Sequence, residues 1–325
     1  MKSGWRSSIL RLLISFGAIG IIAFLLRGKL AEAFIILKKD VAWPWFFITI
    51  ATYMIGLVVL SFRLQSVFSV QKIHLKFSQT FYLGFVGLFF NLFLPSAVGG
   101  DIAKAYYAVK YSGKKLASTT AVLLDRIMGF VTMIFMAFIA VLINARLENE
   151  AVNRLVFLAF FGMLFFILFF ASKRFARLFQ VLRQLIPSLK WRQRLSEIYH
   201  TVYGYKHHAR ALSLCIFLSL IGQSLFILTY YWLARSLGVS LDPWIFFLLV
   251  PVISVVSMAP SIGGLGVREA STVFLFQRFM SPERALALSI LLDMLIYGYS
   301  FAAGILFSIR GGLQTKMVEE MEKIQ

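Results

Sequence analysis

The sequence lacks most of what a water-soluble surface needs. Only 14% of its 325 residues are charged, 60% are hydrophobic, and the mean hydropathy is +0.82. A soluble domain has about 25% charged residues, so this composition excludes a soluble globular enzyme, a disordered chain and a collagen-like repeat. The one cysteine, Cys215, lies in an apolar run and excludes an intrachain disulfide. Asn-x-Ser/Thr glycosylation sequences are also absent, which fits a bacterial or archaeal inner membrane.

Acidic residues are scarce as well. The chain has 14 Asp and Glu against 33 Lys and Arg, a net charge of +19. In a membrane protein, basic loops set the orientation and attract anionic lipid, and the aromatic and basic surface module of a nucleic-acid-binding protein is missing. The four histidines lack the spacing of a metal site, and neither a Ser-His-Asp set nor a carboxylate pair at hydrolase spacing stands out. We therefore expect no nucleic-acid partner, no metal, no cofactor and no enzymatic activity.

Long apolar runs, in contrast, are abundant. Their continuity favours helices, because the strands of a membrane barrel would alternate in roughly 10-residue segments. The predicted fold class is therefore an all-α polytopic membrane protein. Between the fifth and sixth runs lies a basic segment, residues 173–210, which we expect in the cytoplasm, either as an interfacial helix on anionic headgroups or as a solvated loop. The eight runs are 12–26, 41–62, 77–100, 116–145, 155–172, 211–234, 243–267 and 285–309.

The sequence contains an internal repeat. LFLPSAVGGD at 92–101 and SMAPSIGGLG at 257–266 share a Pro-Ser and Gly-Gly skeleton. Each is followed by Leu-Leu-Asp inside an apolar run, at Asp125 and Asp293. Internal repeats are common in transporters, so the order of these landmarks predicts two related membrane halves. The predicted halves are residues 1–150 and 151–325.

Two topologies fit these runs. If all eight span the membrane, the halves are parallel. If the third and seventh are re-entrant hairpins that turn at the Pro-Ser and Gly-Gly sequences, each half has three spanning helices and the halves are inverted. The inverted version places the basic segments 63–78 and 101–116 in the cytoplasm with 173–210, so we expect it, with both termini cytoplasmic. Arg63 and Arg235, which close matching apolar runs, are interpreted as anchors that reach the headgroups.

The two Gly-Gly turns are the first candidate site. At membrane depth such a turn exposes backbone groups that lipid cannot satisfy, so it must be buried in protein or face water. The helix that restarts there presents its positive N-terminus, which suits an anionic group such as phosphate; the alternative is a simple kink where two helices cross. Lys104 and Arg268 directly follow the turns and could bind the same phosphate, or they are charges at helix ends among the headgroups.

Charged residues inside spanning helices are the second candidate site. A carboxylate at mid-membrane costs about 2.5–3.5 kcal/mol on insertion scales, so Asp125 and Asp293 should face protein or water. Asp125 and its neighbour Arg126 project about 100° apart on a helix, so they are poorly placed to pair. Lys104 and Arg268 are the more natural partners. Alternatively, the aspartates bind protons or cations that drive transport.

The segments FNLFLPSAVGGDIAKAYY, LLDRIMGF and PSIGGLGVRE strongly resemble the lysylphosphatidylglycerol synthase transmembrane-region family, over nearly the whole chain. The resemblance implies a multi-pass helical protein that moves lipids or lipid-linked intermediates between leaflets. Lys104 stands where many members have arginine, which puts a bidentate phosphate contact there in doubt. The predicted substrate-binding residues are Asn91, Pro95, Gly99, Gly100, Asp101, Lys104, Pro260, Gly263, Gly264, Gly266, Arg268 and Glu269, and the predicted coupling or ion-pair residues are Asp125, Arg126 and Asp293.

The leading hypothesis is a flippase-like transporter for an anionic phospholipid or a polyprenyl-phosphate-type lipid. In this hypothesis the two hairpins form a polar cavity for the headgroup. The alternative is a membrane accessory subunit that docks a cell-envelope glycosyltransferase through residues 173–210; a membrane enzyme is disfavoured because no nucleophile stands out. Bifunctional family members continue into an aminoacyl-transferase domain and this chain stops at Gln325, so we expect no aminoacylated lipid product. The expected partners are that lipid and the anionic membrane surface, and a homo-oligomer stays open.

Overall fold

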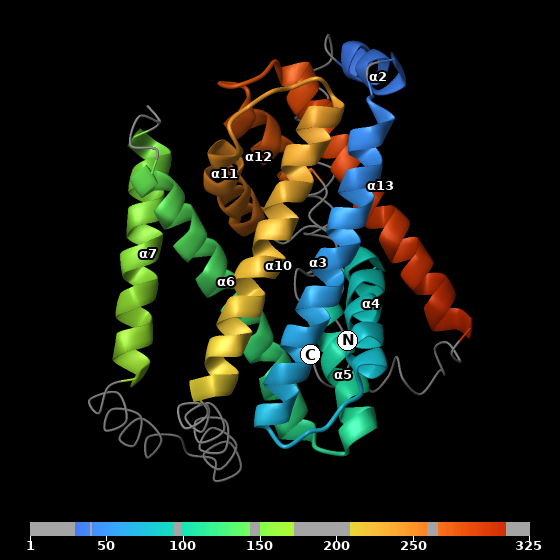
Figure 1. The fold of residues 1–325 in the computed structure, drawn as a ribbon, viewed down its shortest axis with the longest axis vertical. Helices are drawn as coiled ribbons and strands as arrows, with labels where there is room; N and C mark the ends of the chain where they lie inside the picture. The colour runs from blue at the N-terminus through green and yellow to red at the C-terminus, as the bar shows by residue number, and fades with distance from the viewer. Residues whose placement is uncertain are drawn as a thin grey trace, which may run out of the picture.

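A computed structural model describes residues 30–39, 41–93, 99–143, 150–171, 209–258 and 266–309. These parts of the chain are helical and contain no strand, as the composition predicts (Figure 1). The helices are α2 (Leu30–Lys39), α3 (Trp43–Val70), α4 (Phe77–Phe93), α5 (Gly99–Ser112), α6 (Lys115–Ile143), α7 (Glu150–Ala171), α10 (Ala209–Ser236), α11 (Pro243–Val256), α12 (Val267–Phe276) and α13 (Pro282–Ile309).

Five of the described helices are long and apolar enough to cross a membrane: α3, α6, α7, α10 and α13. Four of them have 28 or 29 residues, which is about 42 Å at 1.5 Å per residue and exceeds the roughly 30 Å hydrocarbon core. They match the second, fourth, fifth, sixth and eighth predicted runs, and the chain is therefore a multi-pass membrane protein. The first run, 12–26, lies outside the described residues.

The third and seventh runs each end at a break between two shorter helices. Helix α4 lies in the third run, 77–100, whereas α5 begins at Gly99, inside the Gly-Gly sequence, and continues to Ser112; most of segment 101–116, which was expected in the cytoplasm, is therefore a helix that packs on α4. Helix α11 lies in the seventh run, 243–267, and α12 begins at Val267, after the second Gly-Gly sequence, and packs on α11. Gly266 precedes α12 with a φ of 81°, a left-handed conformation that favours glycine. The intervening segments, 94–98 and 259–265, contain the predicted Pro95, Pro260, Gly263 and Gly264 and lie outside the described residues.

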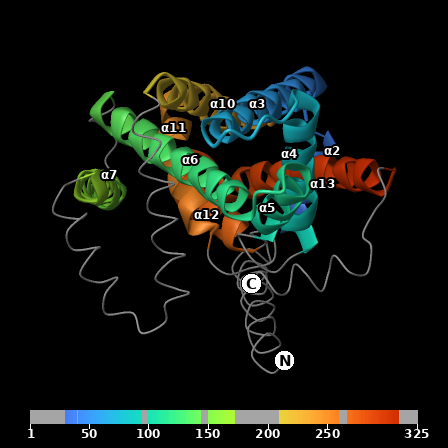
Figure 2. The ribbon, with the colours of Figure 1, turned by 90° about the horizontal axis from the view of Figure 1, so that it is seen from below.

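Helices α3 and α10 form an antiparallel pair along one face of the molecule (Figures 1 and 2). Where they cross, a Cβ on Gly222 would lie 2.5 Å from Leu60 Cδ2, so a larger residue there would force the Leu60 side chain to move. At one end the rings of Trp45 and Trp232 stack with 5.3 Å between their centroids. Ala42 N–H donates to the carbonyl of Ser236 over 2.7 Å at the same end. Close packing thus joins one helix from each half.

Two loops of the first half, from α3 to α4 and from α5 to α6, meet at the lower end of Figure 1. Lys114, between α5 and α6, donates from Nζ to the carbonyl of Lys72, between α3 and α4, over 3.1 Å. The end of α7 and the start of α10 lie at this end too, whereas the loops from α10 to α11 and from α12 to α13 lie at the opposite end (Figure 1). The start of α4 and the end of α5 therefore lie at the same end of the molecule.

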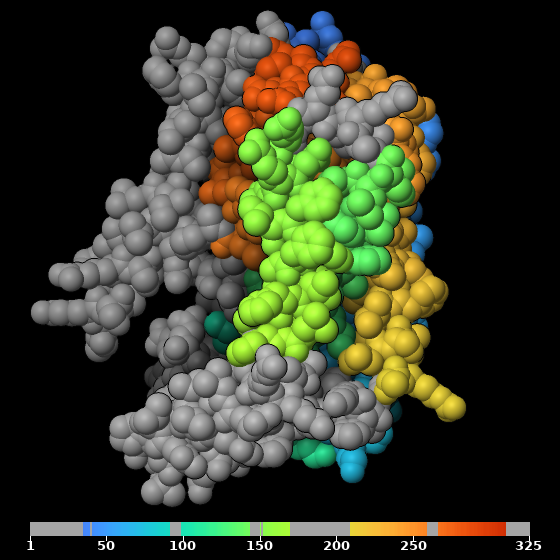
Figure 3. Space-filling model, turned by 90° about the vertical axis from the view of Figure 1, so that its left-hand side faces the viewer, coloured from blue at the N-terminus to red at the C-terminus, as the bar shows by residue number. Residues whose placement is uncertain are grey.

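Helix α7 stands at the periphery, where it packs on α6 (Figures 2 and 3). Its side chains include Leu158 and Phe165, whose exposed fractions are 73% and 69%. A helix face with so many exposed leucine and phenylalanine side chains would be costly in water, whereas in a membrane these side chains contact lipid chains. The outer surface of α7 is therefore suited to contact with lipid, and the charged residues considered below lie inside the molecule.

Candidate functional site

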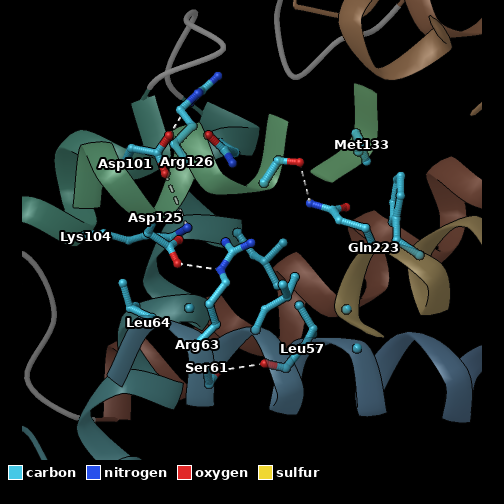
Figure 4. Close-up of a pocket in the computed structure, with 18 of the residues that line it drawn as sticks. Leu57, Ser61, Arg63, Leu64, Asp101, Lys104, Asp125, Arg126, Met133 and Gln223 are labelled. Carbon is cyan, nitrogen blue, oxygen red and sulfur yellow. Dashed lines mark hydrogen bonds and ion pairs between the residues drawn. The ribbon is translucent and has the colours of Figure 1, made fainter. Parts of the chain in front are cut away.

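A cavity of about 380 Å³ lies among α3, α4, α5, α6, α10 and α11, so both halves contribute to it. This volume is in the range of small-molecule sites. Apolar side chains line much of it, and the charged residues come from α3, α5 and α6 (Figure 4). Its charged residues are Arg63, Asp101, Lys104, Asp125 and Arg126. Five charges enclosed by apolar, membrane-spanning helices are the main feature that a function has to explain.

One carboxylate of the cavity, that of Asp101, forms ion pairs with two cations. Asp101, in the first turn of α5, lies 3.3 Å from Lys104 Nζ through Oδ1 and forms an ion pair with Arg126 Nη1 through Oδ2. The side chains are about one-fifth exposed, at 18% for Asp101 and 20% for each cation. Arg126 also lies over the ring of Phe130, 5.5 Å from its centroid. The cluster carries one more positive than negative charge, and its cations remain accessible from the cavity.

Asp125 pairs with Arg63, and this corrects two predictions. Arg63 Nε donates to Asp125 Oδ1 over 2.8 Å, and its Nη1 donates to Ser219 Oγ over 3.1 Å. Arg63 is only 5% exposed, so it is not a headgroup anchor, and Asp125 is paired with neither Lys104 nor Arg268. The anchor prediction was wrong because α3 does not end at Arg63 but continues for two turns to Val70.

A signal for this burial was present in the sequence. After Arg63 the apolar residues Leu64, Val67 and Phe68 recur at helical spacing, and all three are at most 3% exposed. The pairing also agrees with the expected divergence of Asp125 and Arg126, which contact different partners. By contrast, Arg235 lies in the last turn of α10, over the ring of Trp45, as an anchor near the helix end would.

Gly100 and Asn91 connect the two helices of the first pair. Gly100 N–H donates to Asn91 Oδ1 over 2.8 Å. A Cβ on Gly100 would lie 2.6 Å from that oxygen and would also clash with the carbonyl of Gly87 on α4. The predicted headgroup contact through the Gly100 backbone N–H is therefore already taken by a side chain. In the structure Gly100, like its buried neighbour Gly99, belongs to the α4–α5 contact, and Asn91 also lines the cavity.

A second group of charges lies outside this cavity. Arg268 Nε lies 3.1 Å from Asp293 Oδ1, so Arg268, one of the two cations expected to pair with the aspartates, contacts Asp293. Arg268 and Glu269 are each 9% exposed, and Asp293 is 7% exposed. The predicted site residues thus divide into two groups: Asn91, Asp101, Lys104, Asp125 and Arg126 at the cavity, and Arg268, Glu269 and Asp293 in the second group.

The sequence analysis missed polar residues of α10. Ser219 hydrogen bonds Arg63, and Gln223 lines the cavity with its Nε2 3.4 Å from the carbonyl of Gly129. Neutral polar side chains in an apolar run give little signal unless their helical position relative to a charged partner is known. Among the described residues no group of three His, Cys, Asp or Glu side chains could hold a metal ion.

Comparison with known proteins gives one match. Residues 8–304 match the family described as lysylphosphatidylglycerol synthase TM region, which is nearly the whole chain. No curated protein and no solved structure matches it. The motifs on which the resemblance rests include residues of both charged groups, namely Asp101, Lys104, Asp125 and Arg126 of the cavity and Arg268 and Glu269 of the second group, but neither Arg63 nor Asp293.

Proposed function

Because the chain belongs to the lysylphosphatidylglycerol synthase TM region family, we propose that it moves an anionic phospholipid or lipid-linked intermediate between the leaflets of a bacterial or archaeal inner membrane. The observation that carries this proposal is a membrane-embedded cavity with apolar walls and a surplus of one positive charge. The proposal assigns the chain a transport role and no catalytic one.

The charge surplus follows from the lining residues. Arg63, Lys104 and Arg126 contribute three positive charges, and Asp101 and Asp125 contribute two negative charges. An uncompensated charge at membrane depth costs about 2.5–3.5 kcal/mol on insertion scales. One phosphodiester anion would neutralise the cavity. A zwitterionic headgroup would bring a cation as well and leave the surplus in place.

Lys104 and Arg126 are the proposed contacts for that anion. Arg63 is sequestered by Asp125 and Ser219 and is 6% exposed in its side chain, against 20% for Lys104 and Arg126. Arg126 can offer two parallel N–H donors to a phosphate, and Lys104 offers a point charge. Asp101, which pairs with both cations, would hold them in place when the site is empty.

The proposed topology is two inverted halves, with α4–α5 and α11–α12 as re-entrant hairpins. Helices α3 and α10 occupy corresponding places in the two halves, because each precedes the Pro-Ser and Gly-Gly sequence of its half. Their antiparallel arrangement therefore supports inversion. The contact between Lys114 and Lys72 supports a first hairpin that enters and leaves on one side. The basic loops at that end favour a cytoplasmic position, and both termini are placed there with them.

The test is lipid movement in vesicles that contain the purified protein and a trace of fluorescent phosphatidylglycerol. A membrane-impermeant reductant bleaches label in the outer leaflet, so movement from the inner leaflet appears as further bleaching. We expect complete bleaching with the parent protein and a large loss of rate in Arg126→Gln. Arg154→Gln is the matched control, because that arginine lies in an exposed pair on α7, 75% exposed. If the parent bleaches no more label than empty vesicles, the proposal is wrong and the docking role is favoured.

A further inference from the structure

The second group of charges has more acids than bases, whereas the cavity has more bases than acids. Arg268 and Glu269 begin α12, and Asp293 lies in the interior of α13. Arg268 is 3.1 Å from Asp293, and the carboxyl groups of Glu269 and Asp293 lie within hydrogen-bond range of each other. One cation therefore faces two acids in a region where every member is at least nine-tenths buried.

Nothing in the described surroundings compensates for the second acid. Glu269 Oε2 is buried, and no donor among the described residues hydrogen bonds it. The other ionisable side chains that the described helices bring near are tyrosines, namely Tyr230 of α10, Tyr297 of α13 and Tyr53 of α3. Neutral hydroxyls do not cancel a charge. With both acids ionised, the group would carry a net charge of −1 at a position where a buried charge without a partner is costly.

A proton resolves both problems at once. Two carboxylates can only accept hydrogen bonds, whereas a carboxylic acid beside a carboxylate donates one. Acids in such close contact cannot both ionise readily, and one retains its proton. A bare metal ion fits less well, because the described residues offer no third acidic, histidine or cysteine ligand. The arrangement therefore favours one proton held between the two carboxyl groups, with Arg268 balancing the remaining negative charge.

Two tyrosine side chains, Tyr53 and Tyr230, connect this group with the cavity. Tyr53 lines the cavity and also interacts electrostatically with Arg268. Tyr230, 1% exposed, interacts with Arg268, Glu269 and Asp293 as well as with Tyr53. A change of charge on one side of these tyrosines is therefore felt on the other side, because buried charges are only weakly screened.

We propose that Glu269 and Asp293 share one exchangeable proton and that this proton is taken up together with the anionic lipid. Before binding, the cavity is at +1, and the group is at −1 when the proton is absent and neutral when it is present. An anionic headgroup neutralises the cavity and removes the positive charge that favours the deprotonated group, so the bound lipid favours the bound proton. By linkage, the proton favours the lipid to the same extent. The uptake half of this proposal rests on the proposed function, whereas the shared proton does not.

Infrared spectroscopy tests the shared proton without any lipid ligand. The detergent-purified parent at neutral pH should show the carbonyl band of a protonated, buried carboxylic acid. The band should vanish in Glu269→Gln and in Asp293→Asn, because the remaining acid in each is ionised against Arg268. Glu150→Gln, a change at an 85% exposed side chain, should keep it. A parent spectrum without the band, or a band that survives in both variants, would overturn the proposal.

Proton uptake tests the coupling. The measurement is made at the alkaline pH where the infrared band of the lipid-free parent has fallen by half, so that half of the chains lack the proton. Adding micelles of phosphatidylglycerol to the purified protein in weakly buffered solution at that pH should raise the pH reported by a soluble dye, by up to about half a proton per chain. Phosphatidylcholine should cause no change, and Glu269→Gln should take up none, whereas Glu150→Gln should match the parent. Phosphatidylglycerol that binds the parent without proton uptake would overturn the coupling. If the parent bound no phosphatidylglycerol, the proposed function itself would fail, and the infrared band would still decide whether the proton is there.

Discussion

The pair between Arg63 and Asp125 predicts a large and specific loss of stability. Its side chains are only 6% and 10% exposed, and they join α3 to α6 within the membrane region. Asp125→Asn removes the charge while keeping the shape, so Arg63 stays buried without its counterion and keeps the hydrogen bond that its Nη1 donates to Ser219 Oγ. Breaking a buried pair in this way costs about 3–5 kcal/mol, which we expect as the loss in free energy of unfolding.

The assay is equilibrium unfolding in mixed micelles with an increasing fraction of denaturing detergent. The double variant Arg63→Met with Asp125→Leu should recover most of the loss, because apolar residues of similar volume replace a buried pair at little cost. Glu150→Gln breaks an exposed pair with Arg154, 75% and 85% exposed, and should change the free energy of unfolding by at most about 1 kcal/mol.

Two results would refute this reasoning. One is an Asp125→Asn protein as stable as Glu150→Gln, which would mean that Arg63 finds water or another partner. The other is a double variant less stable than either single variant, which would mean that the pair is essential as an ion pair and not merely costly to break.

Three further predictions concern packing, topology and the cavity. Gly100→Ala should destabilise the protein strongly, since its Cβ would clash with Asn91 and the Gly87 carbonyl, whereas Gly162→Ala meets open space and should not; melting temperatures compare the two. Cysteines at the exposed positions of His74 and Gln277 in a Cys215→Ser background should react with an impermeant thiol reagent from the cytoplasm and from outside, respectively; labelling from one and the same side would exclude inverted halves. Lys104→Glu changes the net charge of the cavity from +1 to −1 and should stop movement of phosphatidylglycerol. The melting temperature should stay within a few degrees of the parent's. Continued transport of phosphatidylglycerol by this variant would show that Lys104 does not belong to the site.

The helical membrane fold could be predicted because it depends on a local property. Apolar runs of spanning length predict the five long helices that the structure describes, and the glycine and proline sequences indicate where the third and seventh runs break. The start of α5 at Gly99 and the pairing of Arg268 with Asp293 followed from this kind of reasoning, since the residues beside a break must meet the charges on neighbouring helices.

The partner of Asp125 depends on which helices pack together, and the sequence does not state this. Arg63 is 62 positions away from Asp125 and Ser219 is 156 positions away from Arg63, so only the crossing of α3, α6 and α10 brings them together. The same is true of Gly100, whose role changes from a ligand contact to a helix contact once α4 is seen against it. The pairing of Arg126 with Asp101 likewise requires α5 to lie beside α6.

The central claim is that a surplus positive charge in the cavity selects an anionic headgroup. The most direct test is the ratio of transport rates for fluorescent phosphatidylglycerol and phosphatidylcholine, measured for the parent and for Arg126→Gln. A charge-assisted hydrogen bond contributes about 1.5–3 kcal/mol, so we expect the ratio to favour phosphatidylglycerol in the parent and to fall roughly 10- to 100-fold in the variant. A parent that moves both lipids equally, or a ratio that is unchanged in Arg126→Gln, would contradict the claim.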